Sequence, residues 1–274
     1  QDGDVRGIYH KCFLPNYSVF DEARYFNQGS EIDKIFWFDD VGIGINICED
    51  VWIGDGPAEA QVGNGASIII NINASPFDIS KSASRKDIIT KKSKDLGVPF
   101  IYLNLVGGQD ELVFDGASFV TDSNGELMYE AAEFEEELFN LDISVRVKEK
   151  ASSPSLRLRN SSSKMKNPIS KKRKNKYESI YSALVLGLRD YVGKNNFRKV
   201  LIGISGGIDS ALTATIACDA LGPKNITGLA MPSIFSKESS LKDAENLASN
   251  LKFELKKIHI EDISNKYRNL ISEI

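Results

Sequence analysis

Residues 201–214, Leu-Ile-Gly-Ile-Ser-Gly-Gly-Ile-Asp-Ser-Ala-Leu-Thr-Ala, restrict the possible folds of this chain more than any other stretch. The first residues are apolar and predict a strand, and the residues from Asp209 onward predict a helix. Between them, Gly206 and Gly207 allow backbone conformations that other residues resist, and they let the backbone approach a ligand closely. A strand joined this tightly to a helix is typical of parallel α/β sheets, so we expect one here.

The rest of the second half continues the same alternation of helix and strand. Apolar spacing predicts helices over 176–196, 209–222 and 236–251, and strands over 199–205, 225–233 and 253–260. The sequence therefore predicts a doubly wound parallel α/β domain over residues 176–274. Its C-terminal part is expected to be missing, because the pattern stops inside an apparent helix.

Residues 1–145 alternate short β-like runs with polar turns. Strands are predicted over 7–15, 35–48, 66–75, 99–107 and 117–131, and a helix over 81–97 ends at a glycine with a proline just beyond it. This order predicts a layered α/β domain with a sizeable sheet. Because the chain opens on Gln1 within such a pattern, we expect it to be an internal segment of a longer protein.

Residues 146–175 differ from both halves, because serine, lysine and arginine dominate and the apolar periodicity is lost. A basic run at 171–174, Lys-Lys-Arg-Lys, has two interpretations. It is either a patch for nucleic acid or localisation, or part of a solvated linker between two domains. We favour the linker, since the chain around it is acidic.

Composition excludes several classes of protein. The 274 residues carry a net charge of −4, which gives no electrostatic reason to expect a nucleic-acid or membrane partner. No apolar run is long enough to span a bilayer. Three scattered cysteines, Cys12, Cys48 and Cys218, make neither a disulfide framework nor a zinc site, so we expect a reducing, cytoplasmic location. With only two histidines, a Ser-His-Asp triad is not expected either.

The glycine turn has the composition of an anion site. Successive backbone N–H groups at a helix N-terminus cradle phosphates, and the hydroxyls of Ser205 and Ser210 add donors. Asp209 could hold a magnesium ion bound to the same phosphates. A tight strand-to-helix turn capped by Asp209 is the structural alternative. We favour phosphate binding, although the spacing fits neither a Walker loop nor a dinucleotide fingerprint.

This turn resembles the signature of the ATP pyrophosphatase, or PP-loop, family, which has an adenine nucleotide alpha hydrolase-like fold. The resemblance implies that ATP is cleaved between its α- and β-phosphates, so that an acceptor oxygen is adenylated and a nucleophile then displaces AMP. It implies ATP and Mg²⁺ as cofactors and Asp209 as the metal residue. The ATP-binding residues it implies are Gly203, Ile204, Ser205, Gly206, Gly207, Ile208, Asp209 and Ser210.

Cys48 ends an apolar run in Ile-Cys-Glu-Asp-Val-Trp, residues 47–52, and is either a small buried hydrophobic residue or a nucleophile. Residues 9–26, Tyr-His-Lys-Cys-Phe-Leu-Pro-Asn-Tyr onward, together with 47–52 resemble the nitrilase superfamily, whose amidases use a Glu-Lys-Cys triad in an α-β-β-α sandwich. The resemblance implies that Cys48 and Lys11 are catalytic. A nearby ammonium lowers a thiol pKa and stabilises an oxyanion. On a strand, His10 would point away from Cys48.

The two halves together resemble the glutamine-dependent NAD synthetase family over nearly the whole chain, including residues 71–85, 107–119, 187–197 and 231–248. The resemblance implies that Tyr17, Ser75 and Lys81 bind glutamine. The family's catalytic glutamate lies upstream of its lysine, so no glutamate of this chain is assigned that role; Glu22 and Glu49 belong to other motifs.

The resemblance implies amidation of deamido-NAD to NAD, with ammonia taken from glutamine and with AMP and pyrophosphate as products. The partners are then small molecules, namely glutamine, ATP and deamido-NAD, and we expect a homo-oligomer. Two alternatives remain open. One is a nitrilase-type amidase fused to another PP-loop ligase, and the other is a non-catalytic nucleotide-binding protein.

Overall fold

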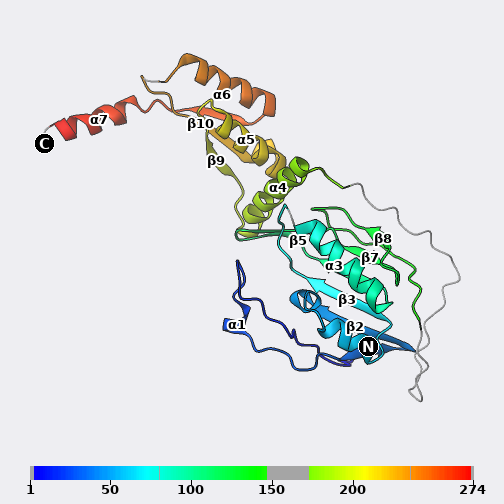
Figure 1. Ribbon diagram of the computed structural model, residues 1–274. Coiled ribbons are helices and arrows are strands. Elements are labelled where there is room, and N and C mark those ends of the chain that lie inside the picture. The colour runs from blue at the N-terminus through cyan, green and yellow to red at the C-terminus, as the bar shows by residue number, and fades with distance from the viewer. Residues whose placement is uncertain (1–2, 80, 147–172, 235, 273–274) are drawn as a thin grey trace. The chain divides into compact units, whose positions relative to one another are not determined.

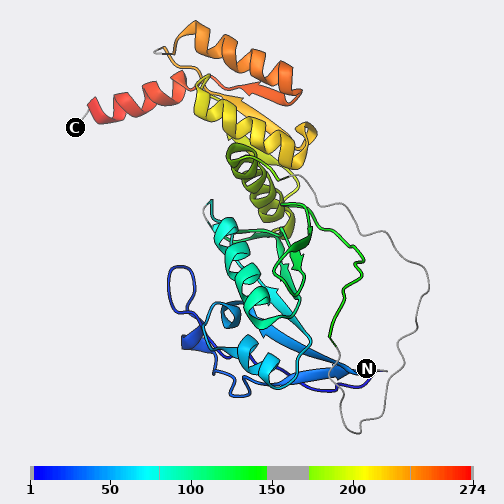
Figure 2. The same cartoon turned by 45° about the vertical axis from the view of Figure 1, so that its right-hand side comes forward.

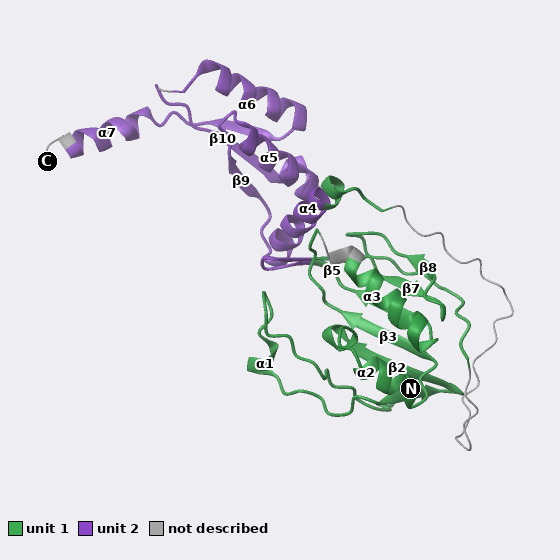
Figure 3. Cartoon of the chain, in the orientation of Figure 1, with its two compact units in different colours: residues 1–107, 114–179 green, residues 108–113, 180–274 purple. Residues whose placement is uncertain are grey.

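The chain divides into two compact units, which Figure 3 colours separately. The computed structural model describes residues 3–79, 81–146, 173–234 and 236–272. Unit 1 contains residues 1–107 and 114–179, and unit 2 contains 108–113 and 180–274. Most of the predicted linker at 146–175 lies outside the described residues, so the predicted domain limits stay predictions. Among the described residues, no helix is both long and apolar enough to cross a membrane.

Unit 1 is built on a six-stranded mixed sheet (Figure 1). Its strands, in spatial order, are β1 (Ile35–Phe38), β2 (Val41–Ile47), β3 (Ile68–Asn73), β4 (Phe100–Asn104), β7 (Phe119–Thr121) and β8 (Leu127–Glu130). The central strands β2, β3 and β4 are parallel, and the outer strands pair antiparallel. The register aligns Ile45 with Ile70 and Ile70 with Ile101. One face of these strands is buried, where Ile69 and Phe100 lie, whereas Ile45, Ile70 and Ile101 on the opposite face are only partly buried.

Two helices, α2 (Pro57–Gly63) and α3 (Lys81–Leu96), pack on this sheet. Ile89 of α3 and Ala58 of α2 join Ile69, Phe100 and Phe119 of the strands in one buried core. As expected, α3 ends at a glycine in the left-handed region, which satisfies the last helical carbonyls. The sheet and its helices supply an α and a β layer of the predicted nitrilase-like fold. A short helix, α1 (Glu22–Tyr25), and a 3₁₀ turn (Cys48–Val51) complete the region around Cys48.

A buried ion pair fastens α3 to the loop after β3. Arg85 donates both to the Asp115 carboxylate, at 2.8 and 2.9 Å, and to the carbonyls of Ser75 and Pro76. Asn104 closes the network, because its side chain accepts from the Ser75 amide and donates to Asp115. Arg85 and Asp115 are both almost fully buried. The loop that carries Ser75 therefore has a defined position although it belongs to no strand.

Unit 2 contains a three-stranded parallel sheet with the order β11 (Glu254–Lys257), β10 (Ile226–Ala230), β9 (Val200–Gly203). The helices are α4 (Lys176–Lys194), α5 (Ile208–Leu221), α6 (Glu238–Leu251) and α7 (Glu261–Ser272), with a 3₁₀ turn at Pro223–Asn225. Helices α5 and α6 lie side by side over the sheet (Figure 2). Small residues, Ala214, Ala217, Ala244 and Ala248, allow this close packing. The predicted parallel α/β architecture is confirmed.

Unit 2 also includes a segment from the first half of the sequence. The hairpin β5 (Val106–Gln109) and β6 (Leu112–Asp115) places its tip against α4. The Gly108 amide donates to Asp190 at 2.7 Å, and the Lys194 ammonium donates to the Gly108 carbonyl at 2.5 Å. A side chain on Gly108 would meet the backbone of Gly187. Sequence periodicity did not predict this hairpin, because its strands are short and the first of them contains two adjacent glycines.

The strand predicted over residues 7–15 is wrong, since this segment has no strand in the structure. Its backbone groups bond to other partners. The amides of Cys12 and Phe13 donate to the Asp50 carboxylate, and the Lys11 carbonyl accepts from Gly29. The apolar residues in this stretch have the spacing of a strand, but its backbone hydrogen bonds are made with the Asp50 side chain and with Gly29 instead of a neighbouring strand. The alternation that predicted His10 to point away from Cys48 therefore does not apply, and His10 lines the same cavity as Cys48.

Replacing Arg85 with alanine should lower the free energy of unfolding by about 3–5 kcal/mol, because Asp115 would keep a buried carboxylate without its cation. Urea denaturation followed by circular dichroism measures this change. Arg24, whose ion pair with Asp21 at 3.5 Å is exposed, is the matched control, and its alanine variant should cost about 1 kcal/mol or less. Equal losses in the two variants would contradict the structural role given to Arg85.

Candidate active site

Cys48 stands directly after β2, at the first position of the 3₁₀ turn. Its φ of 47° lies in the left-handed region, where a residue other than glycine costs about 1–3 kcal/mol. Strain of this kind is found at functional positions, where the surrounding structure holds it. The thiol is free, and the residue is only partly buried, in contrast to the buried Cys12 and Cys218. These features favour the nucleophile over the buried hydrophobic residue.

Lys11 borders the same cavity as Cys48. This cavity has a volume of about 450 Å³, and its lining includes Glu22, Phe20 and His10 as well. The Lys11 ammonium donates to the Glu22 carboxylate, and both side chains are largely shielded from solvent. The structure therefore brings together the two predicted catalytic residues and adds a carboxylate that sequence reasoning had set aside. The eleven-residue separation of Lys11 and Glu22 carries no periodic signal that would have paired them.

The charges around Cys48 oppose one another. Burial is the largest effect and raises the pKa of the Cys48 thiol, and the carboxylates of Glu49 and Glu22 raise it further. The Lys11 ammonium is the main influence that lowers this pKa. The net shift is upward, so the protonated thiol is favoured in this state. The lysine is thus the cation on which thiolate formation depends.

The three residues predicted to bind glutamine lie on different segments. Tyr17 is exposed, and its hydroxyl donates to the Glu49 carboxylate at 2.9 Å. Burial, followed by Glu49, raises the pKa of Tyr17 to about 12. Ser75 is buried and does not line the Cys48 cavity, whereas its neighbour Ala74 does. Lys81 begins α3, but its side chain lies outside the described residues.

The loop at 204–207 joins β9 to α5, with Gly207 as the N-terminal cap of the helix. Ser205 and Ser210 close it, since their hydroxyls lie 3.2 Å apart and the Gly207 amide donates to the Ser205 hydroxyl at 3.2 Å. Gly206 has a φ of 81°. A Cβ at Gly206 would overlap the Ser240 carbonyl oxygen and would lie 2.8 Å from the Ser240 Cα. Only glycine fits at position 206, where the loop backbone lies against the backbone of α6.

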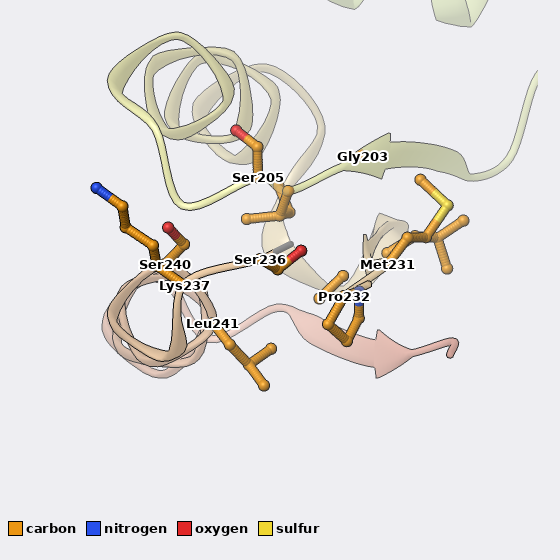
Figure 4. A pocket seen from close by; sticks show the side chains of 11 residues that line it. Gly203, Ser205, Met231, Pro232, Ser236, Lys237, Ser240 and Leu241 are labelled. Carbon is orange, nitrogen blue, oxygen red and sulfur yellow. The ribbon is translucent and has the colours of Figure 1, made fainter. Parts of the chain in front are cut away.

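A cavity of about 660 Å³ lies beside this loop (Figure 4). Ser205 faces it from the end of β9, and Lys237, Ser240 and Leu241 at the start of α6 lie on the other side. Met231 and Pro232 close it after β10. Of the predicted ATP-binding residues, Gly203, Ile204 and Ser205 line the cavity. The other five continue the loop into the first turn of α5.

Asp209 is exposed in the first turn of α5. Among the residues that the structure describes, no three acidic, histidine or cysteine side chains are placed to hold a metal ion. A lone carboxylate is nevertheless consistent with magnesium, which commonly takes one or two carboxylates together with substrate phosphates. Asp209 therefore fits a metal that arrives with a nucleotide, and not a site made of protein ligands alone.

Comparison with protein families identifies both halves. Residues 1–151 match the carbon-nitrogen hydrolase family, and residues 180–274 match the NAD synthase family. The chain belongs to the carbon-nitrogen hydrolase family. Its first half therefore has the nitrilase-like fold predicted from the residues around Lys11 and Cys48, followed by an NAD synthase domain.

Relatives cover both halves at once. The chain is 40% identical to a glutamine-dependent NAD(+) synthetase of Thermotoga maritima and 41% identical to one of Aquifex aeolicus, over 97% of its own length in each case. These alignments cover 49% and 50% of the two relatives, so the chain spans about half of their length. A solved glutamine-dependent NAD+ synthetase of Acinetobacter baumannii in complex with ADP superposes with a TM-score of 0.84. It is 33% identical, and the match covers 99% of this chain and 48% of that one.

Replacing Lys11 with methionine should raise the pKa of Cys48, because the opposing cation is lost while burial and both carboxylates remain. Glu49→Gln should shift the same pKa downward, since it removes a charge that disfavours the thiolate. The rate of Cys48 alkylation by iodoacetamide, measured against pH by mass spectrometry, reports both shifts. Shifts of the same sign in the two variants would contradict the electrostatic arrangement described above.

Gly206→Ala should destabilise the loop by about 2 kcal/mol or more, because the methyl group meets backbone of α6 and the residue is held at positive φ. Gly207→Ala is the matched control. Its φ is −89°, and an added Cβ would meet only the Ser205 hydroxyl, at 3.3 Å. It should therefore cost about 1 kcal/mol or less. Thermal unfolding of both variants measures the difference, and equal melting temperatures would refute the crowding at Gly206.

Proposed function

We propose that the protein containing this chain is a glutamine-hydrolysing NAD synthetase, a carbon–nitrogen ligase. The observation that supports this most directly is the presence in one chain of two sites of different chemistry. Cys48 and Lys11 line one cavity, and the glycine loop after β9 borders another. Relatives named glutamine-dependent NAD(+) synthetases align across both units.

In the first unit the Cys48 thiolate attacks the side-chain amide carbon of glutamine. The nitrogen of the tetrahedral intermediate takes up the proton that the thiol gave up, leaves as ammonia and so gives a thioester, which water hydrolyses to glutamate and the free thiol. Lys11 stabilises the thiolate and the oxyanion, and Glu22 holds the lysine ammonium in place. The proton acceptor is the glutamate that the family resemblance places upstream of Lys11. The glutamine substrate is bound by Tyr17, Ser75 and Lys81. The Glu49 carboxylate, which lies next to Tyr17, suits the α-ammonium group of glutamine.

In the second unit the carboxylate of deamido-NAD attacks the α-phosphate of ATP and releases pyrophosphate. Ammonia then displaces AMP, and the product is NAD. The loop amides and hydroxyls from Gly203 to Ser210 bind the phosphates, as helix N-termini do. Asp209 would hold Mg²⁺, which supplies positive charge to the phosphate oxygens when it is bound. The cavity between β9, β10 and α6 suits the rest of the nucleotide.

The proposal includes small-molecule substrates, a homo-oligomeric assembly and a cytoplasmic location. The location is supported by cysteines that are all free in the structure.

Cys48→Ala in the full-length protein should abolish NAD formation from deamido-NAD, Mg-ATP and glutamine, and should leave NAD formation from ammonium salts intact. The thiol is needed only to release ammonia, whereas ATP cleavage belongs to the other unit. Chromatographic measurement of NAD in parallel glutamine and ammonium assays tests this directly.

Cys218→Ala is the control, because this buried thiol packs in the core of unit 2 and borders neither cavity. It should retain both activities. Loss of both activities in Cys48→Ala would mean that Cys48 is structural. If the unaltered protein makes NAD from neither nitrogen source, the acceptor is not deamido-NAD.

A further inference from the structure

Asp50 is the most fully satisfied buried carboxylate near the active site. Its side chain is completely buried. Oδ1 accepts from the Cys12 amide at 3.0 Å and from the Phe13 amide at 2.8 Å. Oδ2 accepts from the Tyr9 hydroxyl at 2.9 Å and from the Ile47 amide at 3.0 Å. Four hydrogen-bond donors therefore satisfy the carboxylate.

The donors come from two segments that are far apart in the sequence. Tyr9, Cys12 and Phe13 surround Lys11, and Ile47 immediately precedes Cys48. Asp50 itself lies in the 3₁₀ turn that Cys48 begins. The Asp50 side chain therefore connects the backbone just after the lysine, and the Tyr9 side chain before it, to the backbone just before the cysteine and to the turn that the cysteine begins.

This connection is needed because the lysine segment has no strand to hold it. Residues 9–13 lie in no sheet, so the register of paired strands cannot set the position of Lys11 relative to Cys48. Further backbone support comes from Gly29, whose amide donates to the Lys11 carbonyl at 2.8 Å. A Cβ on Gly29 would overlap the His10 carbonyl. Asp50 and Gly29 thus hold the Lys11 segment through hydrogen bonds to different backbone groups.

We propose that Asp50 is a positioning residue for the thiol chemistry, which sets the distance between the Lys11 ammonium and the Cys48 thiol. This role rests on the proposed glutaminase function of Cys48. Asp50 does not touch substrate; it acts through the two residues that it connects. Loss of its carboxylate releases the Lys11 segment from the turn, and the ammonium then no longer stabilises the thiolate.

A direct electrostatic effect of Asp50 has the opposite sign. Removing a nearby negative charge would by itself favour the thiolate and lower the pKa of Cys48. Moving Lys11 away would raise this pKa. The other charged groups that face the thiol, Glu22 and Glu49, are unchanged in either case. The sign of the shift therefore separates positioning from simple charge removal.

The experiment uses Asp50→Asn in the full-length protein, because asparagine keeps the size and one acceptor but loses the charge that binds four donors. Tyr9→Phe is a milder second variant that removes a single donor. Asp122→Asn is the matched control, since Asp122 also accepts from two backbone amides, those of Asn124 and Glu126, in the turn between β7 and β8. Each variant is assayed for iodoacetamide alkylation of Cys48 against pH, for glutaminase kcat and KM, and for ammonium-dependent NAD formation.

For Asp50→Asn we expect the alkylation profile of Cys48 to move to higher pH and the glutaminase kcat to fall by about 10²-fold, with a smaller change in KM. Tyr9→Phe should move both in the same direction by less. Asp122→Asn should leave the alkylation profile unchanged, whatever it does to the melting temperature. Ammonium-dependent NAD formation should persist in all three.

An unchanged or downward-shifted alkylation profile in Asp50→Asn would overturn the proposal. If Asp50→Asn does not fold, an unchanged profile in Tyr9→Phe would overturn it as well. Failure of the proposed function has a different signature. In that case Cys48→Ala leaves glutaminase activity intact, whereas the alkylation profiles still report how Asp50 places Lys11.

Discussion

Parallel pairing of strands brings the carboxyl ends of neighbouring strands to one edge of a sheet, and both sites depend on this geometry. In unit 1, Cys48 follows β2 and Ala74 follows β3, and both line the same cavity. In unit 2, Ser205 follows β9 and Met231 follows β10 beside the other cavity. The apolar runs that form these strands pair with one another in the sheets, while the residues just beyond them are outside the strands and free to carry polar chemistry.

The segments beyond the strands are held by buried polar networks. Arg85 and Asp115 fix the loop that carries Ser75, and Asp50 fixes the segment that carries Lys11. Buried charges of this kind are tolerated when they are paired and hydrogen-bonded, because desolvation would otherwise exceed the gain. Two carboxylate oxygens and two carbonyls surround the two terminal nitrogens of Arg85, whose Nε has no hydrogen-bond partner among the described residues, and four donors surround the Asp50 carboxylate. Loop residues near the active site are thereby placed almost as firmly as residues on strands.

The electrostatics of Cys48 are a balance between burial and one cation. Burial and two carboxylates raise the thiol pKa, and Lys11 opposes them. With Lys11 beside the thiol, the balance in this structure still favours the protonated form of Cys48. A reactive cysteine needs an electropositive environment, and here that environment comes from a single side chain. The position of Lys11 therefore matters more than its presence in the sequence.

The sequence by itself determined the α/β class of both units, the apolar strands β2, β3, β9 and β10, helix α3 with its glycine end, and the strand–glycine–helix turn at 204–207. These are local properties, because periodicity and glycine conformation act over a few residues. It also indicated Lys11 and Cys48, through paired motifs and family resemblance. Only the tertiary structure decided that Glu22 contacts Lys11 and that Tyr17 contacts Glu49. It also decided that the hairpin tip at 108–113 packs with α4 and that residues 7–15 form no strand. Each of these depends on contacts between distant residues, for which hydrophobic periodicity carries no signal.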